Sequence, residues 1–414
     1  MTAGLDPSVA RGRGRGDGAA MTGLGGTGQG GHETVSHPPV AQLDALTALR
    51  FLAAAYVVLF HYDRFFFPDA PRRDWILLGF SGVTFFFVLS GFILAHTYRA
   101  VDLADPAARA RFYRARAARI APLYLVSLLL GLPWFLAWVA KATPPLQPLL
   151  AMGGVLAPLG LHAWLPGAAC SLNCPSWSIS VEVLFYALFP VLLPLVLRRP
   201  GAYAVAAVAL WCVFAAFASL LWDRLAPGVS LIEPEPGGTL AILLAQAIKY
   251  DPLLHLPAFL AGLALYAVFR DRRLPVPALL AAAGAAFLLL LAAFPFVPQP
   301  AMHTGLTVLV WAPLILAGAA IRRGPLVSAP LVYLGRISFA VYLVHTPAYA
   351  VVGTLDRALL HGRLAANPAL SAGLAVALTL AAAVLLHHAV EEPARRRILR
   401  GARPRPEFAA AAAE

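Results

Sequence analysis

Long apolar segments recur along this chain and constrain its fold more than any other feature of the sequence. About 20 apolar residues are enough for a helix to cross the hydrocarbon core of a bilayer. Ten segments come close to that length, and stretches rich in arginine separate many of them. They cover residues 43–62, 75–97, 119–140, 178–197, 202–222, 241–269, 275–295, 304–321, 331–353 and 369–390. The sequence therefore predicts an all-α fold, a polytopic bundle of about ten transmembrane helices.

The composition excludes a water-soluble protein and argues against a nucleic-acid-binding one. The 414 residues are 60% hydrophobic and 13% charged, whereas about 25% of the residues in a typical soluble domain are charged. The net charge is +12, but the basic residues are nearly all arginines in short blocks between apolar segments. Such blocks are typical of topology determinants and phospholipid contacts. A lipid bilayer, and no nucleic acid, is therefore an expected partner.

The sequence divides into three parts. Residues 1–40 are rich in glycine and arginine and lack apolar periodicity, so we expect a disordered cytoplasmic tail. They also lack the apolar core of a cleaved signal peptide, so the first apolar segment is expected to insert the chain. Residues 41–393 form the predicted membrane domain, and residues 394–414 are expected to be a basic cytoplasmic tail.

Two apolar segments contain helix-breaking residues. Residues 148–166 are rich in glycine and proline, so we expect them to be re-entrant rather than to cross the bilayer. The sixth segment carries Lys249, Asp251 and Pro252. It is expected to be a short interfacial helix followed by the true span.

The arginine blocks predict the orientation in the membrane. With ten crossings, five blocks fall on the same side as the N-terminus. These blocks lie at residues 99–119, 198–199, 270–273, 322–323 and 395–405. Because an excess of lysine and arginine marks cytoplasmic loops, both termini are predicted to be cytoplasmic. The expected location is the inner (cytoplasmic) membrane, as a multi-pass protein.

The three cysteines do not form a disulfide framework. Cys212 lies inside an apolar segment, where we expect an inert thiol. Cys170 and Cys174 lie in a loop that the predicted topology places outside. Two free thiols and a local disulfide are both compatible with the sequence there.

Two ionisable residues in the first segment are candidates for function, because such groups are costly inside a bilayer. Arg50 and His61 are eleven residues apart, so they face nearly the same side of a helix, about 16 Å apart along its axis. The alternative is structural. Arg50 would then pair with a carboxylate such as Asp44, and His61 would reach the membrane interface.

Further polar residues are expected near the outer ends of other segments. Glu182 opens the fourth segment and is predicted to be level with His61, although a carboxylate is also favoured at a helix start by the helix dipole. His345 follows Ser338 and Tyr342 in the ninth segment. A lone histidine in an apolar helix is more often a hydrogen-bonded core residue.

Arg116 and Arg119 are a candidate phosphate site. They are three residues apart and so are neighbours on one helix face, and guanidinium groups bind phosphate oxygens in a bidentate manner. Lipid headgroup contact is the alternative. In the second segment Gly91 and its neighbouring glycines either pack helices together or let the backbone approach a ligand.

These candidates have a direction across the membrane. The arginines are expected on the cytoplasmic side, and His61 with its carboxylate on the outer side. Histidine can accept a hydroxyl proton near neutral pH. The arrangement predicts transfer from a cytoplasmic phosphorylated donor to an outer hydroxyl.

Six short elements follow one another between about residues 40 and 400. They are LDALTALRFLAAAYVVLFH with Arg50 and His61, GFSGVTFFFVLSGF at 79–92, RFYRARAARIAPLYL at 111–125, SWSISVEVLFY at 176–186, RISFAVYLVH at 336–345 and VEEP at 390–393. In this order they resemble the membrane acyltransferase-3 family, integral-membrane O-acyltransferases that modify bacterial surface sugars and some secondary metabolites. The chain departs from the family at His387, where members often have an aromatic residue.

The resemblance implies an acyl-CoA donor, most often acetyl-CoA, as co-substrate, with no further cofactor and no metal. It implies His61 as catalytic base and Arg50 as its essential partner. It also places the donor near Arg116 and Arg119, and we add Ser90 and Gly91 to that predicted donor site. Glu182 would orient His61 or tune its charge, and Arg50 would hold the donor or stabilise the oxyanion. Ser338, Tyr342 and His345 would form a further site.

The predicted function is therefore O-acyl transfer to a hydroxyl of a carbohydrate, a cell-surface glycan or a glycosylated metabolite. The alternative is a membrane transporter or exporter of an acylated or anionic substrate, which would use the same charges as a path. The sequence leaves open the acceptor, the acyl chain length, a covalent intermediate and the oligomeric state.

Overall fold

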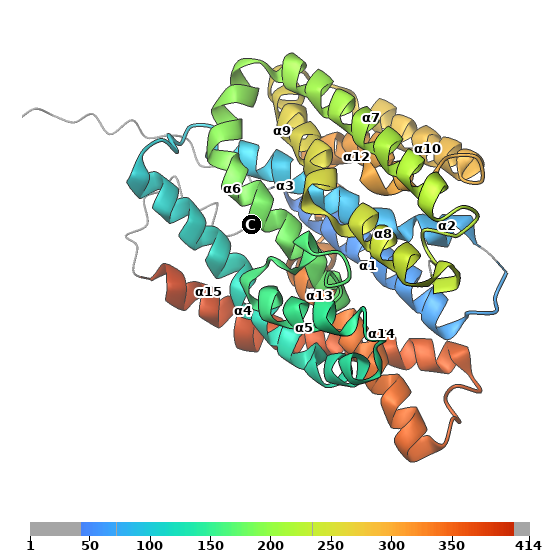
Figure 1. The fold of residues 1–414 in the computed structure, drawn as a ribbon. Coiled ribbons are helices and arrows are strands. Elements are labelled where there is room, and N and C mark those ends of the chain that lie inside the picture. The colour runs from blue at the N-terminus through green and yellow to red at the C-terminus, as the bar shows by residue number, and fades with distance from the viewer. Residues whose placement is uncertain (1–42, 72, 234, 401–414) are drawn as a thin grey trace, which may run out of the picture. The chain divides into compact units, whose positions relative to one another are not determined.

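All regular secondary structure in the described residues is helical, which confirms the predicted all-α fold (Figure 1). This computed structural model describes residues 43–71, 73–233 and 235–400. The expected tail at 1–40, and residues 401–414 of the expected C-terminal tail, lie outside the described residues. The α-helices are α1 (Asp44–Phe66), α2 (Asp74–Leu77), α3 (Gly82–Tyr98), α4 (Pro106–Lys141), α5 (Gln147–Leu156), α6 (Trp177–Arg198), α7 (Pro200–Leu225), α8 (Gly238–Tyr250), α9 (Leu256–Asp271), α10 (Val276–Ala293), α11 (Gln299–Ala301), α12 (Val308–Ala320), α13 (Ala329–Leu355), α14 (Pro368–Leu386) and α15 (Glu392–Leu399).

Ten helical stretches in the described residues are long and apolar enough to cross a membrane, which confirms the predicted number of spans. The largest difference from the prediction is in α4, which begins at Pro106 rather than near residue 119. Alanine and arginine are good helix formers, so the polar residues before the apolar run continue the helix. With 36 residues, α4 is about 54 Å long. Its arginine-rich beginning therefore extends beyond a hydrocarbon core of about 30 Å.

Both segments with helix-breaking residues are interrupted. The helical stretch Gln147–Leu159 is too short to be one of the ten spans. Gly160 follows it with a φ of +68°, a left-handed conformation that glycine adopts at little cost. The sixth span is broken between α8 and α9 by the 3-10 turn Pro252–His255. There the Asp251 carboxylate accepts a hydrogen bond from the Leu253 N–H.

Prolines and capping residues fix the beginnings of several helices. Proline suits the first helical turn, because its φ is already helical and its missing N–H needs no partner there. Pro106, Pro200 and Pro368 begin α4, α7 and α14. Asp105 caps α4 by accepting two hydrogen bonds from backbone N–H groups of the first turn, and these bonds lower the pKa of its carboxyl group.

Glycines allow two helix pairs that position the site to pack closely. A Cβ at Gly91 of α3 would meet the Phe259 carbonyl of α9, and one at Gly262 of α9 would meet the Val88 carbonyl of α3. Gly335 of α13 lies in the same way against the Thr47 carbonyl of α1. Backbones at this distance hold α3 on α9, and α13 on α1, without room for a side chain.

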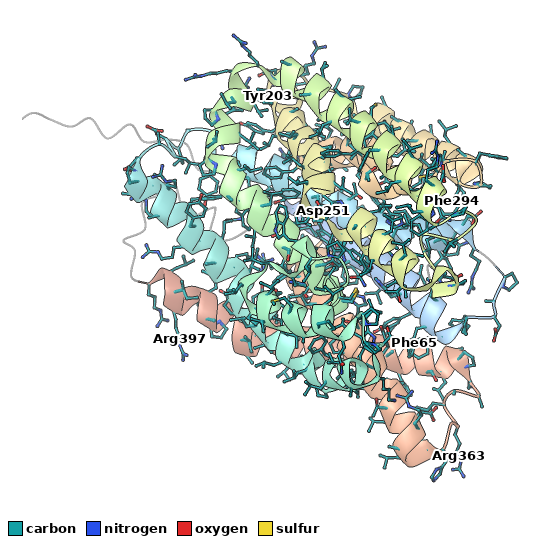
Figure 2. All side chains as sticks on the ribbon, viewed as in Figure 1. Phe65, Tyr203, Asp251, Phe294, Arg363 and Arg397 are labelled. Atoms are coloured by element: carbon teal, nitrogen blue, oxygen red, sulfur yellow. A yellow bond between two sulfur atoms is a disulfide. The ribbon has the colours of Figure 1, made fainter. Side chains whose placement is uncertain are left out.

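Large exposed apolar side chains lie on α4, on α7 and in the turn after α10. Leu129, Val205 and Phe296 are 68%, 70% and 84% exposed. In water such surfaces would favour association, whereas in a bilayer they contact acyl chains. Two arginines labelled in Figure 2 lie near the two ends of the last helical stretch, Arg363 in the connection before α14 and Arg397 in α15.

Candidate active site

Polar side chains from several helices meet in a cavity of about 100 Å³, here called the arginine cavity. Its polar lining consists of Thr47, Arg50, Ser90, Arg116, Arg119, Glu182 and Tyr186. Apolar side chains of α1, α3, α4 and α13 complete it. The structure thus brings together three predicted donor residues, Arg116, Arg119 and Ser90, with the predicted catalytic residues Arg50 and Glu182.

A distant segment holds Arg119 in place. Its guanidinium forms an ion pair with Glu391, in the turn between α14 and α15. Glu391 also accepts a hydrogen bond from His387 Nδ1 at 2.9 Å. The Arg119 guanidinium carbon lies 5.1 Å from the centre of the Phe339 ring. His387, where the chain departs from the family pattern, therefore supports the carboxylate that fixes a cavity arginine.

Glu182 belongs to the arginine cavity, so the expectation that it orients His61 is wrong. Its Oε2 accepts a hydrogen bond from the Tyr186 hydroxyl at 2.5 Å. The charges of Arg119, Arg50 and Arg116 act on it in this cavity. The carboxylate therefore partly compensates three guanidinium groups.

The position of Glu182 follows from where its helix begins. The α-helix α6 begins at Trp177, so Glu182 lies five residues inside it, about 7.5 Å along the axis. It is therefore deeper than a residue that opens a span. The predicted segment began at residue 178, one residue from the observed start of α6, so its bounds were right and the depth of Glu182 within it was neglected.

A second cavity, of about 540 Å³, is here called the histidine cavity. Its basic lining consists of His61, Arg64, Lys249, His255 and His303. Its aromatic lining consists of Phe60, Phe65, Phe80, Phe87, Trp177, Tyr250, Tyr342 and Tyr349, of which Phe65 is labelled in Figure 2. The helix α1 lines both cavities, with Arg50 in one and His61 in the other.

The hydrogen bonds of two histidines define their tautomers. His345 Nδ1 lies 2.6 Å from the Tyr342 carbonyl oxygen, and His345 Nε2 lies 3.2 Å from His61 Nδ1. Because a carbonyl can only accept, His345 Nδ1 carries the hydrogen and its neutral ring has a lone pair on Nε2. His61 Nδ1 must then donate, to His345 and to the Val57 carbonyl at 2.9 Å. The lone pair of His61 is left on Nε2.

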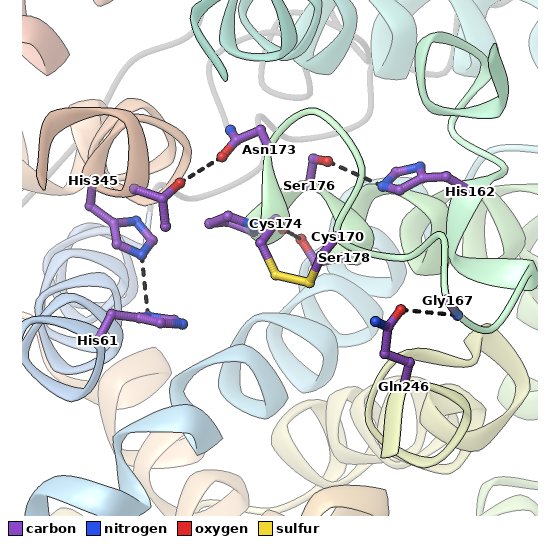
Figure 3. Close-up of a disulfide and its surroundings, with 12 residues drawn as sticks. His61, His162, Gly167, Cys170, Asn173, Cys174, Ser176, Ser178, Gln246 and His345 are labelled. Carbon is purple, nitrogen blue, oxygen red and sulfur yellow. Dashed lines mark hydrogen bonds between the residues drawn. A yellow bond between two sulfur atoms is a disulfide. The ribbon is translucent and has the colours of Figure 1, made fainter. Parts of the chain in front are cut away.

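His345, a candidate site residue from the sequence, thus contacts His61. Its side chain is fully buried, and its own backbone carbonyl accepts a hydrogen bond from the Tyr62 hydroxyl at 2.9 Å. Figure 3 shows the contact between the His61 and His345 rings as a dashed line. The His345 ring thus orients the His61 ring. A histidine that acts as a base is commonly oriented by such a partner on its other ring nitrogen.

A loop closed by a disulfide holds this part of α13 in place. Cys170 and Cys174 are bonded to each other (Figure 3), which resolves the alternative left open by the sequence. Between them, Asn173 Nδ2 donates to the Leu343 carbonyl at 2.8 Å. That carbonyl lacks a helical partner, because the residue four positions later is Pro347, which has no N–H. The loop therefore satisfies the proline-freed carbonyl beside His345.

Two aromatic rings separate the cavities. Phe86 lines the arginine cavity and Tyr342 lines the histidine cavity. Their ring centres are 6.0 Å apart, and the Tyr342 hydroxyl donates to the Pro175 carbonyl at 2.9 Å. We call this pair the aromatic partition. A group that passes from one cavity to the other at this point would have to displace it.

Two predicted site residues line neither cavity. Gly91 packs against the backbone of α9, so it serves helix packing and does not contact a donor. Ser338 is fully buried and donates to the Gly335 carbonyl of its own helix at 2.7 Å. The two differences have the same cause. The sequence does not distinguish a small residue that packs helices together from one that binds a ligand.

Sequence reasoning missed four basic residues of the histidine cavity. Lys249 was noted only as an interruption of the sixth segment. Arg64, His255 and His303 were not considered. The available signal was the cost of an ionisable side chain inside an apolar segment, which marks a functional candidate by default. In the described part of the chain, no group of three or more His, Cys, Asp or Glu residues could hold a metal ion.

Comparisons with known proteins add a family to this geometry. Residues 43–388 match the family model described as an acyltransferase domain. The chain is 33% identical over 389 residues to acyltransferase MdmB of Streptomyces mycarofaciens, which covers 87% of this chain and 93% of that protein. It is 28% identical over 342 residues to a membrane-bound transacylase, BcsY, of Komagataeibacter xylinus, over 78% of this chain and 77% of that protein. No solved structure matches.

Proposed function

Because the chain belongs to the acyltransferase-3 family, we propose that it transfers an acyl group from cytoplasmic acyl-CoA to an acceptor hydroxyl in the histidine cavity. The observation that carries the proposal is the pair of cavities on α1. One cavity has guanidinium groups suited to phosphate, and the other has an imidazole with a free lone pair. Both termini would be cytoplasmic, in the inner membrane, with the arginine cavity on the cytoplasmic side.

The donor would bind through its phosphates. A cavity of about 100 Å³ is too small for a whole CoA molecule, so the nucleotide would lie at its mouth and the thioester arm would enter. Arg116 is the best phosphate ligand, because it is nearly buried and buried guanidinium groups bind anions strongly. Arg119 already has Glu391 as a partner and would supply a second, weaker contact. Ser90 lines the path of the arm.

The chemistry would take place at His61 Nε2. The acceptor hydroxyl gives its proton to this nitrogen while its oxygen attacks the thioester carbonyl carbon. The carbonyl oxygen becomes an oxyanion, which a positive charge of the histidine cavity would stabilise. Arg50 lies in the arginine cavity, about 16 Å from His61 along α1, and would hold the donor there. The carbon–sulfur bond then breaks, and the CoA thiolate takes the proton from His61. The products are an ester and free CoA, so no metal, oxidant or further cofactor enters the balance.

The acceptor would be a hydroxyl of a carbohydrate or glycosylated metabolite, and the acyl group an acetyl group. The aromatic lining of the histidine cavity supports a ring-shaped acceptor, because aromatic faces stack on the apolar faces of sugar rings. A transporter is less well supported, since both named relatives with long matches are acyltransferases or transacylases.

A cell-based comparison tests the proposal even while the acceptor is unidentified. Cells that produce the wild-type chain, the His61→Ala variant or no chain are extracted, and their surface glycans and metabolites are analysed by mass spectrometry. We expect an acylated product with the wild-type chain only. His361→Asn is the matched control, because His361 is exposed in a turn far along the chain. Full acylation by His61→Ala at normal membrane levels would refute the mechanism.

A further inference from the structure

The histidine cavity contains a lysine ammonium without a counter-charge in the described structure. Lys249 is one of only two lysines in the chain, the other being Lys141. It ends α8 beside Tyr250, and its Nζ lies 5.4 Å from the centre of the Tyr250 ring. The ammonium forms no hydrogen bond or ion pair with any described residue. A ring face offsets only part of the cost of placing a cation within a protein.

None of the described residues that line the histidine cavity carries a carboxylate. The other cation of the cavity, Arg64, is paired with Glu233, whose side chain is 61% exposed. That acid therefore compensates Arg64 at the rim and leaves Lys249 inside. The charges of Lys249 and Arg64 both act on His61. The cavity is thus positive where the proposed acceptor binds.

A neighbouring imidazole adds a second group without a partner. His303 lines the same cavity, its ring is stacked on Phe80 with centres 4.0 Å apart, and its Nε2 is buried without a hydrogen-bond partner. The charge of Lys249 acts on this ring as well. Buried cations are normally paired, and buried polar atoms are normally hydrogen-bonded. One anionic group in the cavity would satisfy the ammonium.

We propose that the acceptor is anionic, a sugar-like ring that carries a carboxylate or a phosphate, and that Lys249 binds this group. That the bound ring is the acyl acceptor rests on the proposed function. That Lys249 binds an anionic ring does not. Lys249 would then determine specificity, because the aromatic walls accept any ring and the ammonium selects the charged one. His61 would act on a hydroxyl of the same ring.

Protection of Lys249 from an amine reagent tests the proposal directly. The purified full-length protein in detergent is treated with acetic anhydride at limiting dose, and modification of each lysine is measured by mass spectrometry. Lys141, which is exposed at the end of α4, is the internal reference. The probes are methyl glucuronide and glucose 6-phosphate, with methyl glucoside as the neutral ring of the same size.

We expect methyl glucuronide or glucose 6-phosphate to slow modification of Lys249 at concentrations about tenfold lower than methyl glucoside, as a charge-assisted contact provides, and to leave Lys141 unchanged. The stronger of the two anionic probes distinguishes carboxylate from phosphate. Equal protection by the neutral ring, or no protection by any probe, would overturn the proposal.

Two substitutions separate the role of charge from that of shape. In the Lys249→Arg variant the preference for the anionic ring, measured by thermal stabilisation, should persist. In Lys249→Gln it should fall to about the neutral value. A preference retained in Lys249→Gln would also overturn the proposal. Binding is measured without acyl-CoA, so a protein that binds the anionic ring but transfers no acyl group would refute the proposed function alone.

Discussion

The two cavities on α1 handle charge in opposite ways. In the arginine cavity, Glu182 lies among the guanidinium groups, and Glu391 pairs with Arg119. In the histidine cavity, no described lining residue is acidic. Backbone carbonyls accept hydrogen bonds from His61 and His255 there, whereas His303 Nε2 is buried without a hydrogen-bond partner. The first cavity is internally compensated and can stay assembled when the donor leaves. The second is open to a charge that the substrate brings.

Of the four positions tested below, His345 is expected to have the largest effect on activity when it is substituted. The substitution changes the histidine cavity only. His345→Leu removes one of the two acceptors of His61 Nδ1–H and leaves only the Val57 carbonyl, so the ring is less well oriented and kcat should fall about 100-fold. His345→Gln can still accept that hydrogen bond through its amide oxygen and should retain much of the activity. Steady-state kinetics with purified protein measures both. Equal losses in the two variants would mean that His345 only fills space.

Substitution of Arg116 should act on the other cavity and on a different constant. Arg116→Gln loses a charge-assisted contact to the donor phosphate, so KM for acetyl-CoA should rise about 30-fold with little change in kcat. Arg114→Gln is the control, since Arg114 lies on the same helix but does not line the cavity. A fall in kcat at unchanged KM would contradict the division of roles in which the arginine cavity binds the donor and the histidine cavity carries out the reaction.

Acid should weaken the packing around the start of α6, where Pro175 and Trp177 line the histidine cavity. His162 hydrogen-bonds to the Ser176 and Ser180 hydroxyls at 3.1 and 3.2 Å, and burial lowers its pKa to about 4. An unfolded histidine has a pKa near 6.5. Below that value the unfolded chain binds the extra proton, so stability is full above about pH 6.5 and declines toward pH 4. The loss is about 2 kcal/mol by pH 5.

The measurement is thermal unfolding in detergent at about pH 7 and about pH 5. His162→Gln keeps an amide that can bond to both serines but does not titrate there. Its unfolding temperature should therefore depend less on pH than that of the wild-type protein. An unchanged pH dependence in this variant would show that other groups determine the acid sensitivity.

Opening the aromatic partition should have the smallest effect. Phe86→Leu removes a ring from between the cavities, so water can approach the donor thioester and CoA release without acceptor should rise about threefold. Phe85→Leu is the matched control, because Phe85 is adjacent but packs against Trp311 and lines neither cavity. A thiol-reactive dye measures the release. Identical rates in both variants would show that the rings do not separate the cavities.

The fold was largely predictable from the sequence, because span length and apolar composition are local properties. The early start of α4 was missed, since a search for apolar runs ignores helix-forming alanines and arginines before the run. The meeting of Arg50 with Arg116 and Arg119 was anticipated only as a shared side of the membrane. Their convergence on one cavity depends on the packing of α1, α3, α4 and α6.

The details of the site were less predictable, because they depend on contacts between distant segments. His345 and His61 meet because Gly335 lets α13 pack on the backbone of α1, and no spacing in either segment reveals this. Glu182 was expected level with His61, although the start of α6 was predicted to within one residue; only the packing of the helices shows that it lines the arginine cavity. Lys249 could have been found by treating every ionisable residue in an apolar segment as a candidate.

The aromatic partition also has a consequence for the cell that carries this protein. A bacterial membrane stores energy as a proton gradient, and a continuous file of water through any protein would discharge it. The arginine and histidine cavities are separate, and the Phe86 and Tyr342 rings that line them lie 6.0 Å apart. Aromatic rings packed at such a point would keep water from forming a continuous file. An acyl group on a flexible arm can pass when the rings part, and the transfer then costs the cell no ion leak.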